Sequence, residues 1–168
     1  MTISIRPADL SDTPFIMASI RDLAEFEKLA HEVEVTPSMI DRALFGGAPR
    51  VFCDIAEWHG EPCGMALWFY SFSTFSGRHG IYLEDLYVRP KGRGRGLGKA
   101  LLVYLAKRCL NEKLTRLEWS VLDWNSAAIE FYKAHGAAFL DDWTKCRISG
   151  EALARLGRAA RPVAVPVR

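Results

Sequence analysis

The chain has 168 residues, 49% of them hydrophobic and 25% charged, with a formal net charge of +2 at pH 7. A chain of this size and composition folds as a globular domain without disulfide or metal staples, and its near-neutral charge argues against a dedicated nucleic-acid-binding protein. Its apolar runs are too short to cross a bilayer and its N-terminus lacks a secretory signal pattern, so we expect a cytoplasmic protein that does not contact membranes.

The cysteines and histidines are scattered along the chain. No two cysteines have the close spacing of a zinc site, and no His-Glu-x-x-His pattern occurs. We therefore predict no bound metal and expect reduced, mostly buried thiols. The cysteines are Cys53, Cys63, Cys109 and Cys146.

The first half of the chain predicts a strand, two helices and a hairpin. Residues 3–6 alternate as in a strand, and Ser11 or Asp12 is expected to cap a helix that runs to about residue 28. A second, short helix opens at Thr36 and ends at Gly46. Residues 51–58 and 63–72 are expected to pair as antiparallel strands around a turn at His59.

The second half alternates strands with helices. The pattern predicts strands over 81–88 and 117–122 and helices over 97–110 and 126–135, the last one ending at Gly136. Short strands at Phe139 and over 144–148, then a small helix over 149–156, are expected to follow. This order predicts an α/β fold made of one domain over residues 1–157, with a flexible tail over residues 158–168.

A turn rich in glycine and basic residues separates the expected strand 81–88 from the expected helix 97–110. Glycine lets backbone N–H groups approach a ligand, and a helix N-terminus adds unpaired donors and a partial positive charge. The combination predicts a cradle for a phosphate or pyrophosphate, with a passive, solvated turn as the alternative. Its spacing fits neither a P-loop nor a dinucleotide-binding fingerprint. The turn runs through Arg93, Gly94, Arg95, Gly96, Leu97, Gly98 and Lys99.

The pattern Arg-x-x-Gly-x-Gly, formed by Arg93, Gly96 and Gly98, resembles the signature of the GCN5-related N-acetyltransferase (GNAT) superfamily. The resemblance implies an α/β fold with a mixed, mostly antiparallel central sheet flanked by helices. It also implies acetyl-coenzyme A as co-substrate, with its pyrophosphate on the backbone amides of the turn and its pantetheine arm along the preceding strand. The implied cofactor-binding residues are Leu86, Tyr87, Val88 and the whole turn from Arg93 to Lys99.

A second segment, from Asn125 to Gly136, resembles the N-x-x-A-x-x-F-Y-x-x-x-G signature of the same superfamily. By this resemblance, Asn125 and Tyr132 contact the cofactor, and Tyr132 is the general acid that protonates the departing thiolate. Taken from the residues alone, Asn125 is equally a helix N-cap and Tyr132 a core aromatic side chain.

The segments Tyr82–Val88 and Leu23–Glu27 resemble the spermidine/spermine (diamine) acetyltransferase branch. The resemblance implies that Glu84 binds the substrate and draws a proton from its amine, and that Phe26 and Glu27 line the pocket. Asp85 is a weaker candidate, because neighbouring strand residues face opposite sides of a sheet. The branch also implies a homodimer that uses the expected C-terminal strands, near residues 143–148.

The expected reaction is direct attack of a primary amine on the thioester, with the Val88 N–H stabilising the oxyanion. The acceptor is a polyamine or diamine, or a thialysine- or lysine-like amino acid. The loop 73–80 is expected to shape the pocket, and its Arg78 favours a substrate that carries a carboxylate. Two alternatives stay open: an acetyltransferase that acts on a protein or peptide amine, and a non-catalytic nucleic-acid binder.

Overall fold

The computed structural model describes residues 2–158, which form two compact units, one ending at Ser120 and the other beginning at Val121. The predicted flexible tail lies, from residue 159 onward, outside the described residues. None of the helices within residues 2–158 has the length and apolar character that crossing a membrane requires.

The first unit is built on a five-stranded sheet in the order β1-β2-β3-β4-β5. All neighbouring strands are antiparallel except β4 and β5, which are parallel, so the predicted mixed, mostly antiparallel α/β fold is confirmed. The strands are β1 (Ile3–Pro7), β2 (Phe52–Trp58), β3 (Glu61–Ser73), β4 (Arg78–Val88) and β5 (Leu117–Glu118). The helices are α1 (Thr13–Phe26), α2 (Pro37–Phe45) and α3 (Leu97–Asn111), with 3-10 turns at Leu10–Asp12, Ala30–Glu32 and Pro90–Gly92.

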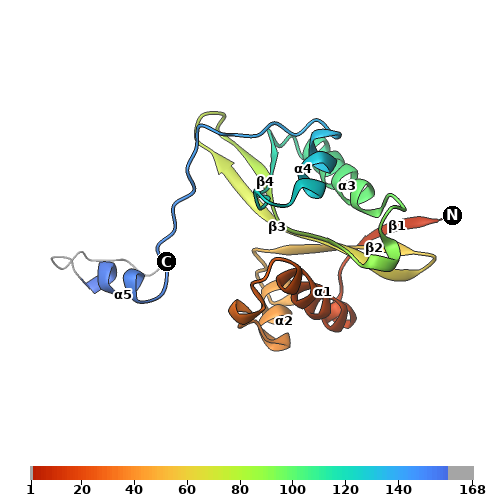
Figure 1. Cartoon of the computed structure of the whole chain (residues 1–168), viewed down its shortest axis with the longest axis horizontal. Helices are drawn as coiled ribbons and strands as arrows, with labels where there is room; N and C mark the ends of the chain where they lie inside the picture. The colour runs from red at the N-terminus through yellow and green to blue at the C-terminus, as the bar shows by residue number, and fades with distance from the viewer. Residues whose placement is uncertain (1, 159–168) are drawn as a thin grey trace. The chain divides into compact units, whose positions relative to one another are not determined.

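The helices cover the two faces of this sheet, with α1 and α2 on one side and α3 on the other (Figure 1). On the α1 face, apolar side chains of α1 and α2 pack against Ile55 of β2, Met65 of β3 and Tyr87 of β4. On the α3 face, Arg108 lies over the ring of Trp68. Three of the four cysteines are buried, at positions 53, 63 and 109, and Cys146 is exposed.

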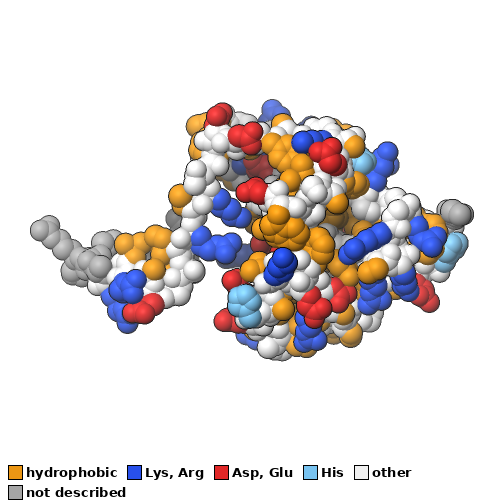
Figure 2. Space-filling view, in the orientation of Figure 1, with side chains coloured by type: hydrophobic (Ala, Val, Ile, Leu, Met, Phe, Trp, Pro, Cys, Tyr) orange, Lys and Arg blue, Asp and Glu red, His pale blue; other side chains and the backbone are white. Residues whose placement is uncertain are grey.

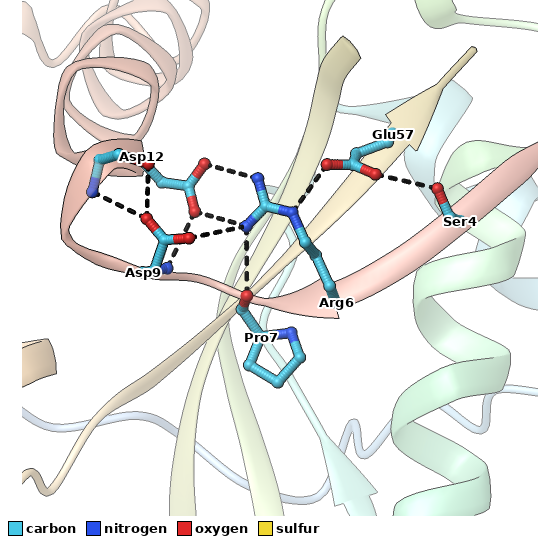
Figure 3. A network of polar contacts seen from close by, with 7 residues as sticks. Ser4, Arg6, Pro7, Asp9, Asp12 and Glu57 are labelled. Carbon is cyan, nitrogen blue, oxygen red and sulfur yellow. Dashed lines mark hydrogen bonds and ion pairs between the residues drawn. The ribbon is translucent and has the colours of Figure 1, made fainter. Parts of the chain in front are cut away.

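The entry into α1 differs from the predicted cap. The Asp12 side chain is 4% exposed and makes no capping bond to α1. It instead accepts two hydrogen bonds from the Arg6 guanidinium, at 2.6 and 2.9 Å, while Arg6 Nε donates to Glu57 at 2.7 Å (Figure 3). Asp9 is the residue that caps the preceding 3-10 turn. A buried carboxylate is stabilised more by a bidentate ion pair with a guanidinium than by a capping hydrogen bond. The Arg6–Asp12 ion pair therefore joins β1 to the start of α1.

Two strands differ in length from the prediction. β4 begins at Arg78, because residues 74–77 form a tight turn and the rest of the expected loop pairs with β3. β5 is only two residues long, although the sequence pattern predicts a strand over 117–122. β5 pairs with Ile81 and Tyr82 only. The register shift that follows in β4 bends this strand away from β5, and the parallel pairing ends there.

The second unit contains α4 (Ser126–Lys133) and α5 (Gly150–Arg158). α4 is followed by Gly136, whose φ of 83° is the left-handed conformation expected of a residue just past a helix end. α5 confirms the predicted small helix. The predicted strands at residue 139 and over 144–148 are wrong, because the described residues 137–149 form no strand. A strand needs a ladder partner for its backbone groups, and the second unit supplies none within its described residues.

Candidate active site

The first feature of the site is the outer edge of β4. Gly64 of β3 lies opposite Val88 of β4. The next pair along the ladder, Cys63 and Arg89, is hydrogen-bonded, since Arg89 N donates to Cys63 O at 2.8 Å. In an antiparallel ladder this makes Gly64 and Val88 a non-hydrogen-bonded pair, so the N–H and C=O groups of Val88 point away from β3. By the same alternation those of Leu86 do so as well. β5 reaches only Ile81 and Tyr82, so within the described part of the first unit no strand pairs with β4 at Leu86 and Val88, where the Arg93 side chain donates to Val88 O. We call this the open edge of β4.

A β-bulge at Glu84 determines which side chains of β4 face α1. Leu67 of β3 is opposite Asp85 and Trp68 is opposite Leu83, which leaves Glu84 as the extra residue. One inserted residue reverses the facing of every side chain that follows it. Asp85 and Tyr87 therefore turn toward α1, and Leu86 and Val88 turn toward α3.

The bulge assembles a carboxylate cluster, which we define as Glu27, Glu84 and Asp85. Burial raises the pKa of Asp85 to about 6, and the negative charges of Glu84 and Glu27 add to the rise. Burial also raises the pKa of Glu27 at the end of α1. Phe26 beside it is exposed, as is Glu84. Asp85, predicted to be a weaker candidate, is thus the carboxylate of this cluster whose pKa is raised to about 6. Strand periodicity holds no signal for this, because a bulge depends on the pairing with β3.

The second feature is the turn between β4 and α3, where two glycines adopt left-handed conformations. Gly94 has φ of 72°, and Gly96, the N-cap of α3, has φ of 86°. The first backbone bond of α3 runs from Ala100 N to Gly96 O at 2.9 Å. The amides of the first helical turn, from Leu97 to Lys99, therefore have no acceptor within the helix. These donors carry the partial positive charge of a helix N-terminus.

Arginine side chains fold back onto the backbone of this turn. Arg93 Nε donates to Val88 O at 3.1 Å, and Arg95 Nε donates to Lys91 O at 3.0 Å. The Arg95 guanidinium also lies 5.1 Å from the centre of the Trp58 ring. Lys and Arg side chains gather at the right of the view in Figure 2, over the segment between β4 and α3. The basic residues of the region are Arg89, Lys91, Arg93, Arg95 and Lys99.

The two features adjoin, and together they fit the two parts of coenzyme A. Left-handed glycines, free first-turn amides and flanking bases suit a pyrophosphate. The open edge at Leu86 and Val88 suits an extended amide-containing arm, which can pair with it as an added strand would. Tyr87 lies between these two residues but does not contribute to the edge, because its backbone groups pair with Met65 of β3 and its side chain, 5% exposed, belongs to the core against α1.

Asn125 and Tyr132 belong to the second unit. The Asn125 side chain caps α4 by accepting from Ala128 N at 3.2 Å, which is the structural alternative expected for it. Tyr132 is 9% exposed and its ring packs at 5.3 Å from that of Phe131. The structure thus gives the local setting of both residues, and their roles toward the cofactor stay predictions.

Arg78 and His79 do not lie near the carboxylate cluster. Both belong to β4, at the end that pairs with Phe72 and Ser73. Arg78 is separated from Asp85 by about 20 Å along the strand, at about 3.3 Å per residue. The expectation that the loop 73–80 shapes the amine pocket stays a prediction, although Arg78 lies too far along β4 to contact Asp85.

A residue that the sequence pattern does not single out also faces the site. Asp22 of α1 accepts a hydrogen bond from the Tyr87 hydroxyl at 2.7 Å.

Among residues 2–158, no cluster of three or more His, Cys, Asp or Glu side chains is arranged to hold a metal ion.

Comparison with known proteins points to one family. A model described as "Acetyltransferase (GNAT) family" matches residues 17–137. Thialysine N-epsilon-acetyltransferase of Mus musculus is 38% identical over 163 residues, which cover 90% of this chain and 95% of that protein. L-ornithine N5-acetyltransferase NATA1 of Arabidopsis thaliana is 30% identical over 194 residues, covering 89% and 85%. The integron cassette protein VCH_CASS6 from the V. cholerae mobile metagenome has the same fold, with a TM-score of 0.78, 23% identity and coverage of 94% and 99%.

Proposed function

Because the chain belongs to the acetyltransferase (GNAT) family, we propose that it transfers the acetyl group of acetyl-coenzyme A to a primary amine of a small molecule at the carboxylate cluster. The observation that carries this proposal is the β-bulge at Glu84. The bulge turns Asp85 to the α1 face, where the charge of Glu27 acts on it, while the residues on either side of Tyr87 keep the open edge. The acceptor and donor sites therefore adjoin on one strand.

The donor is proposed to bind along Leu86 and Val88 and onto the turn that precedes α3. Acetyl-coenzyme A, when bound, supplies an activated thioester carbonyl. The outward N–H of Val88 is suited to donate to that carbonyl oxygen as negative charge develops on it. The left-handed conformations at Gly94 and Gly96 keep the turn amides accessible to the pyrophosphate.

The carboxylate cluster is proposed to bind and deprotonate the amine. An ammonium ion cannot attack a thioester, because its lone pair holds a proton. A group with pKa of about 6, as for Asp85, is ionised at neutral pH and is a stronger base than an ordinary aspartate. Glu27 and Glu84 add attraction for the cation. We propose Asp85 as the residue that draws the proton, directly or through water, with Glu84 as a substrate-binding neighbour.

Tyr132 is proposed as the general acid of the same reaction. A phenol placed near the departing sulfur protonates the thiolate and so assists its departure. No acetyl-enzyme is needed, because attack by the amine is direct. The buried thiol of Cys53 is poorly suited to act as a nucleophile, since burial and nearby carboxylates raise its pKa.

For the acceptor, we propose an amino acid or diamine with a terminal primary amine. Two relatives are named for acetylating thialysine and L-ornithine, and both names specify a side-chain nitrogen. The carboxylate cluster supports the recognition of such a cation. Because Arg78 lies far from Asp85, this structure supplies no reason to prefer an acceptor with its own carboxylate. A homodimer remains part of the proposal.

Release of free thiol from acetyl-coenzyme A tests the function. The acceptors are thialysine, ornithine, lysine, diamines, spermidine and lysine-containing peptides, each at the same concentration. We expect turnover with small terminal amines and little with peptides. Turnover with peptides alone would identify a protein acetyltransferase instead, and no turnover with any amine would contradict the proposal.

A further inference from the structure

Tyr87 lies between the two residues whose backbone forms the open edge of β4. Its side chain is 5% exposed and packs among the apolar residues of the α1 face. Only its hydroxyl reaches a polar partner, and it donates to Asp22 Oδ2 at 2.7 Å. Burial, followed by the nearby Asp22, raises the pKa of Tyr87 to about 12, so the phenol remains a donor at neutral pH. The bond joins the proposed donor strand to α1.

The α1 end of this bond is also the acceptor side of the site. Asp22 lies one helical turn before Phe26, so the two side chains share one face of the helix. Glu27 follows directly. On β4, Asp85 lies two residues before Tyr87 and faces the same side. The interface between α1 and β4 thus holds the Asp22–Tyr87 bond and, near it along the two elements, the acids Glu27 and Asp85.

The two acids oppose the packing of this interface. The negative charge of Glu27 is one cause of the raised pKa of Asp85, which means that the two carboxylates repel each other. This repulsion weakens the packing of the last turn of α1 on β4, and the positive charge of an amine would offset it. The hydrogen bond from Tyr87 to Asp22 holds this end of α1 against β4, whereas the Arg89 guanidinium, 4.5 Å from the centre of the Phe15 ring, holds the first turn of the helix.

We propose that Asp22 is a positioning residue, whose hydrogen bond with Tyr87 holds the acceptor-binding end of α1 against β4 so that the amine meets the donor. The inference rests on the proposed function and adds a residue that touches neither substrate. It predicts that the bond affects use of the amine and leaves the turn that precedes α3 unaffected.

The experiment compares Asp22→Ala, Asp22→Asn and Tyr87→Phe with the unmodified protein in steady-state kinetics. Asp22→Ala and Tyr87→Phe are expected to raise the KM for the amine about tenfold, in line with the loss of a hydrogen bond to a charged group. The KM for acetyl-coenzyme A is expected to stay within about twofold. Asp22→Asn keeps an acceptor oxygen and should recover most of the loss. The double variant Asp22→Ala with Tyr87→Phe should have the same KM for the amine as either single variant, because the two substitutions remove the same hydrogen bond.

Tyr70→Phe is the matched control. The Tyr70 hydroxyl donates to Glu112 at 2.6 Å, so this variant also removes a bond from tyrosine to carboxylate, but between β3 and the end of α3. Because the Tyr70 bond is exposed, this variant should lower the melting temperature by no more than Tyr87→Phe does, and it should leave the KM for the amine unchanged. An equal rise in that KM for Tyr70→Phe, or an equal rise in both KM values for Tyr87→Phe, would overturn the positioning role.

Hydrogen exchange supplies a readout that does not depend on turnover. The amide of Glu27 bonds to Leu23 O at 2.9 Å in the last turn of α1. Its exchange should accelerate about tenfold in Asp22→Ala relative to the amides at the start of α1. Unchanged exchange would refute the inference even if no amine is turned over, whereas absence of turnover with accelerated exchange would refute only the proposed function.

Discussion

Replacement of Asp85 by asparagine is expected to stabilise the protein while impairing acetyl transfer. The pKa of Asp85 is raised from an ordinary value of 3.8 to about 6, mainly by burial. At 1.36 kcal/mol per pKa unit, the ionised form costs the folded state about 3 kcal/mol above pH 6. The asparagine side chain is neutral and has the same shape, but burial of its amide also costs free energy. We therefore expect Asp85→Asn to raise the free energy of unfolding by about 1–3 kcal/mol at pH 8.

The pH dependence has a definite sign. Between pH 4 and pH 6 the folded state keeps a proton on Asp85 that the unfolded chain releases, so the stability of the unmodified protein falls as pH rises through this window. The advantage of Asp85→Asn should therefore be about half as large at pH 5 as at pH 8. Acetylation should fall at both pH values, because the proposed base is lost.

Urea unfolding followed by tryptophan fluorescence at pH 5 and pH 8 measures this effect. Glu84→Gln is the control, since it removes only an exposed neighbour of Asp85 and should give a smaller gain in the same direction. A gain that is equal at both pH values, or absent at pH 8, would show that Asp85 is not a buried, destabilised carboxylate.

Three further sets of substitutions have defined expected outcomes. Gly96→Ala and Gly77→Ala each place a methyl group at a positive φ without a steric clash, and each should cost about 1 kcal/mol in unfolding free energy. Only Gly96→Ala should weaken coenzyme A binding in calorimetry, and equal binding in both variants would remove the turn from the donor site. Asp12→Asn should lose about 2 kcal/mol in urea unfolding at pH 7. Arg6 holds the pKa of Asp12 below its ordinary 3.8, so this difference should shrink as pH falls below that value, and a difference that does not depend on pH would contradict the ion pair. Tyr132→Phe should lower kcat about 100-fold without changing the KM for acetyl-coenzyme A, and full activity at saturating substrates would exclude Tyr132 as the acid.

Features fixed by a few neighbouring residues were predictable. Thr36 accepts a bond from Met39 N at 3.4 Å and starts α2, which ends at Gly46 as expected. The Gly-rich turn between β4 and α3 was also predicted, and its glycines at 94 and 96 are left-handed; its role as an anion cradle stays a prediction. Each of these depends on local backbone preferences that a short sequence segment contains.

Features that depend on partners distant in sequence were not predictable. Asp12 has the residue type and position of a cap, but Arg6 and the buried setting change its role. The bulge at Glu84 follows from the pairing with β3, and it reverses the relative importance of Glu84 and Asp85. The predicted C-terminal strands have suitable residues, but a strand forms only where a partner edge is available.

Hydrogen exchange with and without coenzyme A tests the central claim, that the open edge of β4 and the turn before α3 form the donor site. Binding of coenzyme A is expected to slow exchange at the amides of Leu86 and Val88 and over residues 94–99, and to leave exchange unchanged in the turn at residues 74–77 between β3 and β4. Protection confined to other segments, or tight binding that leaves Val88 unprotected, would contradict it.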